Sequence, residues 1–247
     1  MSELASESLK LNLTIVSLTA RALLGRRRVW LLLPMPALLI GLTLIAESSG
    51  ESIADWGPVV FGQLGLAVIL PLTALIVGAS VLGLEIEDGT ITHLLTKPLP
   101  RREIILAKLA VAGTVSALAT AIPLIVAGAI TGSASLAVGL GVGAALGALT
   151  YTTVFLALSL MTRRPVGVGL VYIILWENLL TRYVDGTRVL SIREYAASVA
   201  EKIAATTWLP AHLALPTAVI LAAVITVAGT ATATARLRSF SLAGETS

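Results

Sequence analysis

The chain has 247 residues and a formal net charge of +3; 56% of its residues are hydrophobic, only 13% are charged, and the mean hydropathy is +0.94. A soluble domain carries about 25% charged residues, and a soluble core of this size cannot bury so much apolar surface. The composition therefore excludes an ordinary soluble protein and predicts an integral membrane protein. The sequence has no cysteine, which excludes disulfides, thiolate nucleophiles and cysteine metal sites.

Residues 9–24 have the pattern of an amphipathic helix. Leu9 and Leu13 lie on one helical stripe, whereas Lys10 and Arg21 lie on another. This spacing predicts a helix that lies in the cytoplasmic interface before the first span. The alternative is a simple extension of the first span, but the glycine and three arginines that follow favour a break.

Six apolar stretches follow, each near the 20 or so residues that a spanning helix needs. The first starts late and has no clear cleavage site, so we expect it to remain as an anchor. The sequence predicts an all-α polytopic membrane domain over 29–236, with a cytoplasmic N-terminus at 1–28 and a cytoplasmic tail at 237–247. The predicted spans cover residues 29–46, 58–84, 104–130, 136–161, 166–183 and 214–235.

Residues 186–212, between the last two spans, predict an external helical segment. Ser191 and Glu194 fit a capping box, in which the serine is the N-cap and the glutamate reaches back to it. Apolar residues then recur at helical spacing from Ile192 to Ile203. We expect this helix to rest on the membrane or on the mouth of the bundle.

The basic residues predict the orientation. With six spans, four lysines and arginines fall in or beside the long loop before the last span, and the others fall on the side of the two termini. The positive-inside rule therefore predicts cytoplasmic termini. The residues on the side of the termini are Lys10, Arg21, Arg26, Arg27, Arg28, Lys97, Arg101, Arg102, Lys108, Arg163, Arg164, Arg236 and Arg238, and those on the other side are Arg182, Arg188, Arg193 and Lys202.

The inner loop at 85–103 is the most informative stretch. Asp88 and Gly89 mark a turn, residues 90–96 have room for about two helical turns, and Pro98 would end them. From the charges alone, the loop could equally be a solvated connection with ordinary flanking residues.

The loop and the start of the third span resemble those of ABC-2 type transporter permeases. The predicted interfacial helix, six spans, cytoplasmic termini and external helix fit the same family, as does the segment from Tyr172 to Glu177. The resemblance therefore covers nearly the whole chain. The matching residues are Glu85, Gly89, Thr90, Leu94, Leu95, Pro98, Leu99, Arg101, Ile105, Leu106 and Lys108.

The resemblance implies that a short helix in this loop docks on a separate ATP-binding cassette subunit and passes its motion to the spans. ATP and Mg would then be bound by that partner, because none of the four lysines follows a glycine as a phosphate-binding loop requires. A second permease copy, with a homodimer favoured, and membrane lipid are the other expected partners; no nucleic acid is expected. The predicted coupling residues are Glu85, Glu87, Asp88, Gly89, Thr90, Thr92, His93, Leu94, Leu95, Lys97, Arg101 and Arg102.

Two features inside the spans stand out. Gly139, Gly143 and Gly147 recur every four residues and predict a close helix-packing face, within the subunit or between subunits. Glu177, with Asn178 beside it, is a carboxylate inside a span, which is costly unless it faces protein or water. It is either a gate or pathway residue, or a structural group satisfied by a partner such as Arg182 or by an interfacial position.

Other classes fit less well. The two histidines, His93 and His212, are predicted on opposite sides of the membrane, so they cannot serve one intramembrane active site. An ion-coupled carrier would need more ionisable groups at mid-membrane than Glu177. The sequence therefore predicts a permease subunit that is not itself an enzyme. The resemblance implies export across a bacterial cytoplasmic membrane.

Overall fold

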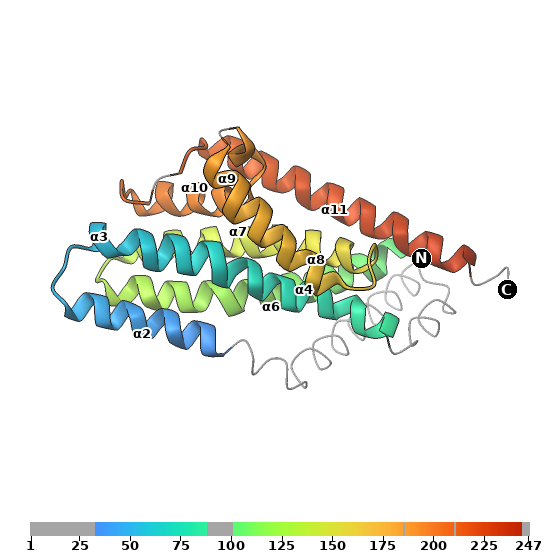
Figure 1. Cartoon of the computed structure of the whole chain (residues 1–247), viewed down its shortest axis with the longest axis horizontal. Helices are drawn as coiled ribbons and strands as arrows, with labels where there is room; N and C mark the ends of the chain where they lie inside the picture. Colours follow the sequence, from blue (N-terminus) through green and yellow to red (C-terminus); the bar gives the residue numbers. More distant parts are fainter. Residues whose placement is uncertain (1–32, 88–100, 185, 210, 244–247) are drawn as a thin grey trace, which may run out of the picture.

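The computed structural model describes residues 33–87, 101–184, 186–209 and 211–243. The predicted interfacial helix at 9–24 and residues 88–100 of the inner loop lie outside this part. The described residues form helices joined by short turns (Figure 1). In chain order the helices are α2 (Pro34–Ser48), α3 (Ile53–Gly57), η2 (Pro58–Ile69), α4 (Leu70–Glu87), α6 (Arg101–Ile130), α7 (Ala134–Ser159), α8 (Pro165–Val171), η3 (Tyr172–Leu180), α9 (Thr181–Tyr183), η4 (Thr187–Leu190), α10 (Ile192–Ala204) and α11 (Leu215–Ala243).

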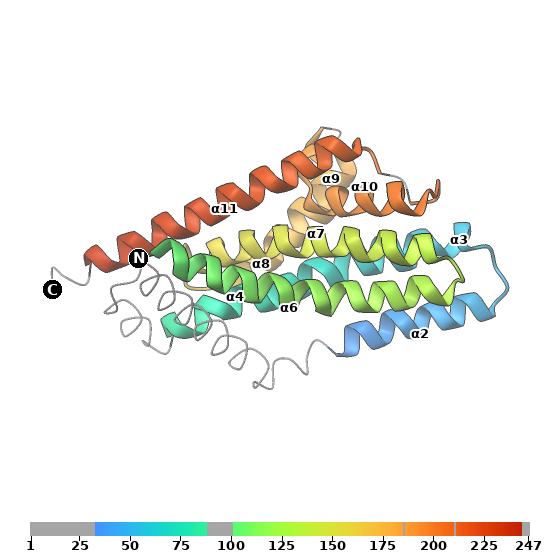
Figure 2. The same cartoon turned by 180° about the vertical axis from the view of Figure 1, so that it is seen from behind.

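The bundle is built around α7, which packs against α4, α6, α10 and α11. Helices α6 and α7 form a tight hairpin. At its turn, a Cβ on Gly128 would lie 2.7 Å from the Cα of Ala137, so the glycine permits the close approach. Ser133 caps α7 by accepting a hydrogen bond from the Leu136 amide at 3.2 Å. Figure 2 shows α6 and α7 side by side, with α11 crossing beside them.

Within the described residues, each of the six predicted spans overlaps a helical segment. Four described helices are long and apolar enough to cross a membrane: Ile53–Val81, Arg102–Ile130, Ala134–Ser159 and Leu215–Leu237. Pro34–Ser48 and Pro165–Leu180 are apolar but shorter. The all-α membrane class is thus confirmed, while the count of six spans stays a prediction.

Two of the helices contain wide, π-helical turns. The second apolar helix has this winding from Pro58 to Ile69, and the fifth has it from Tyr172 to Leu180. In η2, the backbone amide of Leu70 donates to the carbonyl oxygen of Gly65, five residues back. Hydropathy predicts that these segments are apolar helices, but it cannot detect π winding, which often marks functional positions.

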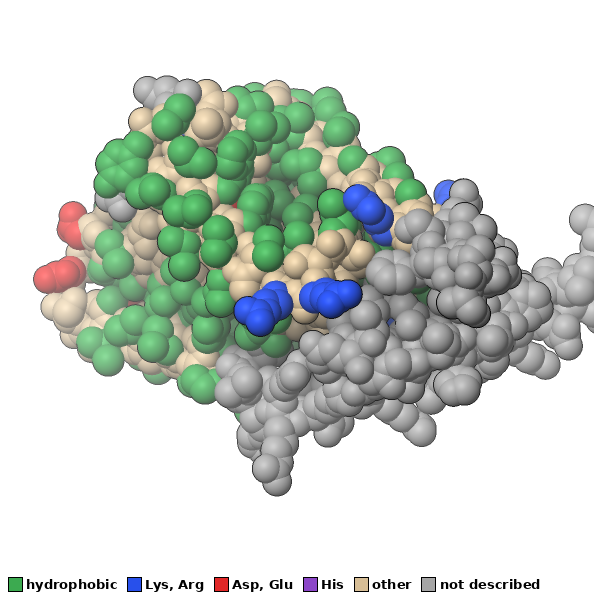
Figure 3. Space-filling model, turned by 45° about the vertical axis from the view of Figure 1, so that its right-hand side comes forward, with side chains coloured by type: hydrophobic (Ala, Val, Ile, Leu, Met, Phe, Trp, Pro, Cys, Tyr) green, Lys and Arg blue, Asp and Glu red, His purple; other side chains and the backbone are tan. Residues whose placement is uncertain are grey.

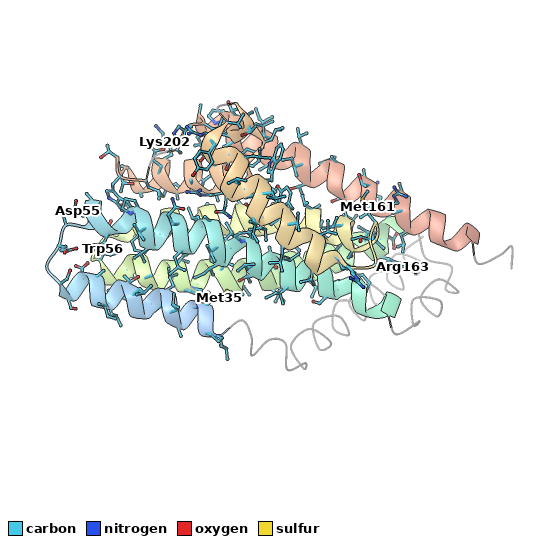
Figure 4. All side chains as sticks on the ribbon, in the orientation of Figure 1. Met35, Asp55, Trp56, Met161, Arg163 and Lys202 are labelled. Carbon is cyan, nitrogen blue, oxygen red and sulfur yellow. The ribbon has the colours of Figure 1, made fainter. Side chains whose placement is uncertain are left out.

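Charged side chains gather at opposite ends of the bundle. We call one the arginine end, where Arg102, Arg163, Arg164 and Arg236 lie, and the other the acidic end, where Glu47, Glu51 and Asp55 lie. Arg163 and Asp55 mark these two ends in Figure 4. In Figure 3, blue Lys and Arg groups border the green apolar surface, and red Asp and Glu groups lie at the far edge. Which of the two ends faces the cytoplasm stays a prediction.

Candidate functional site

Two helix ends frame the predicted coupling loop. Helix α4 ends at Glu87 and α6 begins at Arg101, both at the arginine end of the bundle (Figure 1). Of the predicted coupling residues, Arg102 alone has a described side chain, and it is exposed. The side chains of Glu85, Glu87 and Arg101 are not described. The remaining predicted coupling residues, Asp88, Gly89, Thr90, Thr92, His93, Leu94, Leu95 and Lys97, lie outside the described residues.

Lys108 links these two helices close to the loop. Its side chain is only 1% exposed, and its Nζ donates to the carbonyl oxygen of Val81 at 3.3 Å. Burying an ammonium group is costly unless the group is hydrogen-bonded. The last turns of α4 are thus joined to the second turn of α6 by a polar contact as well as by apolar packing, in which Val81, Ile104 and Ile105 belong to one buried cluster.

The glycine stripe of α7 packs against α10 within the subunit. A Cβ on Gly139 would lie 2.6 Å from the carbonyl oxygen of Ala200, and a Cβ on Gly143 would clash with the carbonyl oxygen of Ala196. The missing side chains therefore let the two backbones approach. Of the two alternatives that the sequence leaves open, packing within the subunit accounts for these glycines.

This packing places α10 differently from the predicted external helix. The helix exists, and Ile192, Tyr195 and Val199 are buried as their spacing predicts. However, α10 lies antiparallel along the glycine-bearing half of α7, rather than over the mouth of the bundle. The physical reason is the groove left by the glycines, which the small residues of α10 fill.

The fifth apolar helix and α10 together form a broken element. The helix from α8 through α9 runs from the arginine end and leaves the bundle near mid-length; after the short η4 turn, α10 continues toward the acidic end (Figures 1 and 2). Irregular backbone at membrane depth is tolerated where protein groups satisfy it. The break is therefore a place where polar side chains are needed.

Glu177 supplies the main polar contacts at this break. Its Oε1 accepts from the Tyr172 hydroxyl at 3.1 Å and from the Ile192 amide at 3.0 Å, and its Oε2 accepts from the Ser191 hydroxyl at 2.5 Å. The side chain is 1% exposed. The carboxylate thus binds the N-terminus of α10, where backbone amides have no partner within the helix.

Aromatic residues surround the same carboxylate. Phe155 stacks on Tyr151 with ring centroids 5.8 Å apart and meets Tyr172 edge-on at 6.1 Å. The buried Tyr151 hydroxyl lies near Glu177 but makes no hydrogen bond with the described residues. The buried carboxylate therefore lies among aromatic side chains from α7 and η3 and against the start of α10.

Asn178 completes the wide turn rather than joining Glu177. Its Nδ2 donates to the carbonyl oxygen of Ile173 at 2.9 Å, five residues back. This contact satisfies a carbonyl group that π winding leaves open. The Arg182 side chain, the partner that the sequence suggests for Glu177, is not described.

The predicted capping box is half correct. Ser191 is the N-cap of α10 and accepts from the Glu194 amide at 3.3 Å. The Glu194 carboxylate does not reach back, because its Oε2 contacts both the backbone amide and the Nδ1 of His212, each at 3.3 Å. Seven residues on, Glu201 accepts from the Ala211 amide at 3.1 Å. The two glutamates therefore hold the connection to α11 against α10.

Tyr195 holds the turn that precedes α10. Its hydroxyl donates to the carbonyl oxygen of Val189 at 2.6 Å. This hydrogen bond ties the first turn of α10 back to the η4 turn.

Two buried polar contacts are not predicted by the sequence: that of Lys108, and that between Ser116 and Thr152. The sequence places Lys108 among the residues that match the family and at the inner end of the third span, and its position four residues inside the predicted span is the signal of its burial. Ser116 and Thr152 form a buried hydroxyl pair, at 3.0 Å, between α6 and α7. Nothing in the sequence pairs two residues so far apart in the chain.

The comparisons with known proteins agree with this architecture. A family model described as "ABC-2 family transporter protein" matches residues 24–182, which is more than half of the chain. The matched stretch contains α2 to α7, the predicted coupling loop at 85–103 and the fifth apolar helix with Glu177. No curated protein matches the chain at a significant level. The chain therefore belongs to the ABC-2 family of transporter proteins and is a membrane permease of that type.

Proposed function

We propose that this permease is the exporting membrane subunit of an ABC transporter, driven by a separate ATP-binding subunit that docks on the loop at 85–103. The observation that carries the proposal is the Lys108–Val81 contact, which joins the two helices flanking that loop. A push on the loop would move α4 and α6 together, because their ends are tied. ATP and Mg would be bound by the partner.

The contacts of α7 extend this path toward the acidic end. Helix α6 packs on α7 along the hairpin, and α7 carries α10 in its glycine groove. A shift of α6 and α7 would therefore change the position of α10 and the break at Glu177. Nucleotide binding would in this way shift the population between inward-facing and outward-facing forms.

Glu177 acts in this scheme as the anchor of α10. Its three hydrogen bonds support an anchoring role, and its location at a break in the helix keeps a gating role in the pathway as a second possibility. The two roles make different demands on the charge. An anchor needs an acceptor, which glutamine also provides, whereas a pathway carboxylate needs its charge.

We further propose a homodimer in a bacterial cytoplasmic membrane, with both termini cytoplasmic. Apolar side chains exposed on the described part of α2 and on the fifth helix, such as Ile45 and Ile174, would contact lipid or the second copy. The arginine end would face the cytoplasm, where the ATP-binding subunit is available.

The deciding experiment is affinity purification of the tagged chain from its native membrane, followed by an ATPase assay. We expect an ATP-binding subunit to co-purify, and we expect substitution of residues 87–92 to abolish its stimulated activity. Substitution of Glu51 and Asp55 at the acidic end is the matched control and should leave the activity unchanged. A chain that purifies alone and supports transport from an ion gradient would instead establish an ion-coupled carrier.

A further inference from the structure

A groove of about 700 Å³ lies between α6 and α11, with α7 as its floor. Leu106 and Leu109 line it from α6, Leu149 lines it from α7, and Val227 and Thr230 line it from α11. Its volume is within the range of roughly 300–1,000 Å³ that is typical of sites for small ligands. The groove is open on one side, so a molecule could enter it from the surrounding membrane.

Two of the threonine hydroxyls in this groove are already satisfied within α11. Thr230 donates its hydroxyl to the carbonyl oxygen of Thr226 at 2.7 Å, and Thr234 donates to that of Thr230 at 2.8 Å. These hydroxyls therefore do not require hydrogen bonds from an occupant. The middle of the groove is suited to an alkyl chain.

One end of the groove is positively charged. Arg102 lines the groove at the start of α6, and its side chain is exposed. None of the described residues that line the groove is acidic. Figure 2 shows the start of α6 and the end of α11 at the arginine end of the bundle. The groove thus combines a long apolar wall with one cation at the arginine end of the bundle.

The packing of α11 accounts for the opening. Of the four long apolar helices in the described part, α11 is the least buried. It approaches α7 closely at Gly229, where a Cβ would lie 2.8 Å from the Thr153 methyl carbon. On the side toward α6 it leaves the floor at Leu149 exposed to the groove.

We propose that this groove binds a membrane phospholipid with an anionic headgroup, with an acyl chain between α6 and α11 and the phosphate at Arg102. Basic residues between spanning helices on the cytoplasmic side are suited to anionic headgroups. The inference concerns the lipid-facing wall of the subunit and does not depend on ATP coupling. The binding test therefore uses the purified permease without its partner.

The cysteine-free sequence allows a single fluorophore to be placed in the groove. We would label V227C at the rim of the groove and compare it with V224C, a valine on the same helix that does not line it. Their native side chains are 69% and 56% exposed, respectively. The probes are vesicles that contain phosphatidylglycerol or phosphatidylcholine carrying the same nitroxide-labelled acyl chain.

We expect phosphatidylglycerol to quench the V227C label more strongly than phosphatidylcholine does. The apparent affinity should differ roughly fivefold, which corresponds to about 1 kcal/mol per basic residue. The V224C label should show no such preference. In the V227C background, Arg102→Gln should remove the preference, whereas Arg102→Lys and Arg164→Gln should keep it. The lysine variant also shows that position 102 tolerates substitution.

Three results would overturn the proposal. Equal quenching of V227C by both lipids would exclude headgroup selection at this groove. Loss of the preference in Arg164→Gln as well would assign it to the general surface potential. Weaker quenching at V227C than at V224C by both lipids would mean that protein covers the groove. In that case, a disulfide between the V227C residues of two copies would identify the covering protein as a second subunit.

Discussion

The Glu177 carboxylate accepts a hydrogen bond from the Ser191 hydroxyl at 2.5 Å, and the same hydroxyl accepts one from the Glu194 amide. Ser191 is therefore both the N-cap of α10 and the link between α10 and the fifth helix. A residue inside an apolar helix thus holds the first turn of a separate amphipathic helix in place.

This relationship predicts that Glu177→Ala releases the start of α10. Hydrogen bonds to a charged group are worth about 1.5–3 kcal/mol each, so loss of even one should speed local exchange at least roughly tenfold. We expect faster hydrogen exchange at the Ile192 and Glu194 amides, with the amides of α6 unchanged. Unchanged exchange at Ile192 would contradict the anchoring role.

Glu177→Gln separates anchoring from a role of the charge. The amide oxygen can still accept from the Ile192 amide, so we expect α10 to keep most of its protection. Normal transport in this variant, at normal expression, would exclude a pathway role for the charge. Loss of transport with α10 still protected would support that role.

The contact between α7 and α10 predicts a large effect of a small change. Gly143→Ala places a methyl group against the carbonyl oxygen of Ala196, and overpacking of this kind costs about 1–3 kcal/mol. We expect a lower melting temperature of the purified protein. Gly167→Ala is the matched control, because a Cβ there has no neighbour within 4 Å. Equal melting temperatures would argue against the close packing of α10.

The contact of Lys108 with Val81 predicts that a variant at position 108 can fold normally and yet fail to couple the permease to ATP hydrolysis. Lys108→Met keeps most of the side-chain volume and removes the charge together with its hydrogen bond to the Val81 carbonyl oxygen, which stays within α4. We expect little change in melting temperature but loss of substrate-stimulated ATPase activity in the complex with the ATP-binding subunit. Full stimulation in this variant would exclude Lys108 from the coupling path.

The charge distribution predicts which end faces the cytoplasm. We expect a membrane-impermeant maleimide to label D55C in intact cells and to label R163C only after the cells are opened. V224C, within the apolar part of α11, should stay unlabelled in both. Labelling of R163C in intact cells would reverse the orientation and place the coupling loop outside.

The amino-acid sequence alone determined the membrane class, the positions of the helices and the two charged ends. These follow from local properties: a long apolar run such as 104–130 must be helical in lipid, since only a helix satisfies its backbone internally. The same holds for the start of α10, because Ser191 caps the helix from the adjacent residue.

The tertiary structure alone decided which groups meet. Glu177 binds the N-terminus of α10 rather than acting at a span's end, Gly143 faces Ala196, and Lys108 reaches Val81. Hydropathy is similar around all faces of a spanning helix, so it does not indicate which face meets which neighbour. Packing in a bilayer depends on shape and on buried hydrogen bonds rather than on apolar burial, and these are properties of the assembled bundle.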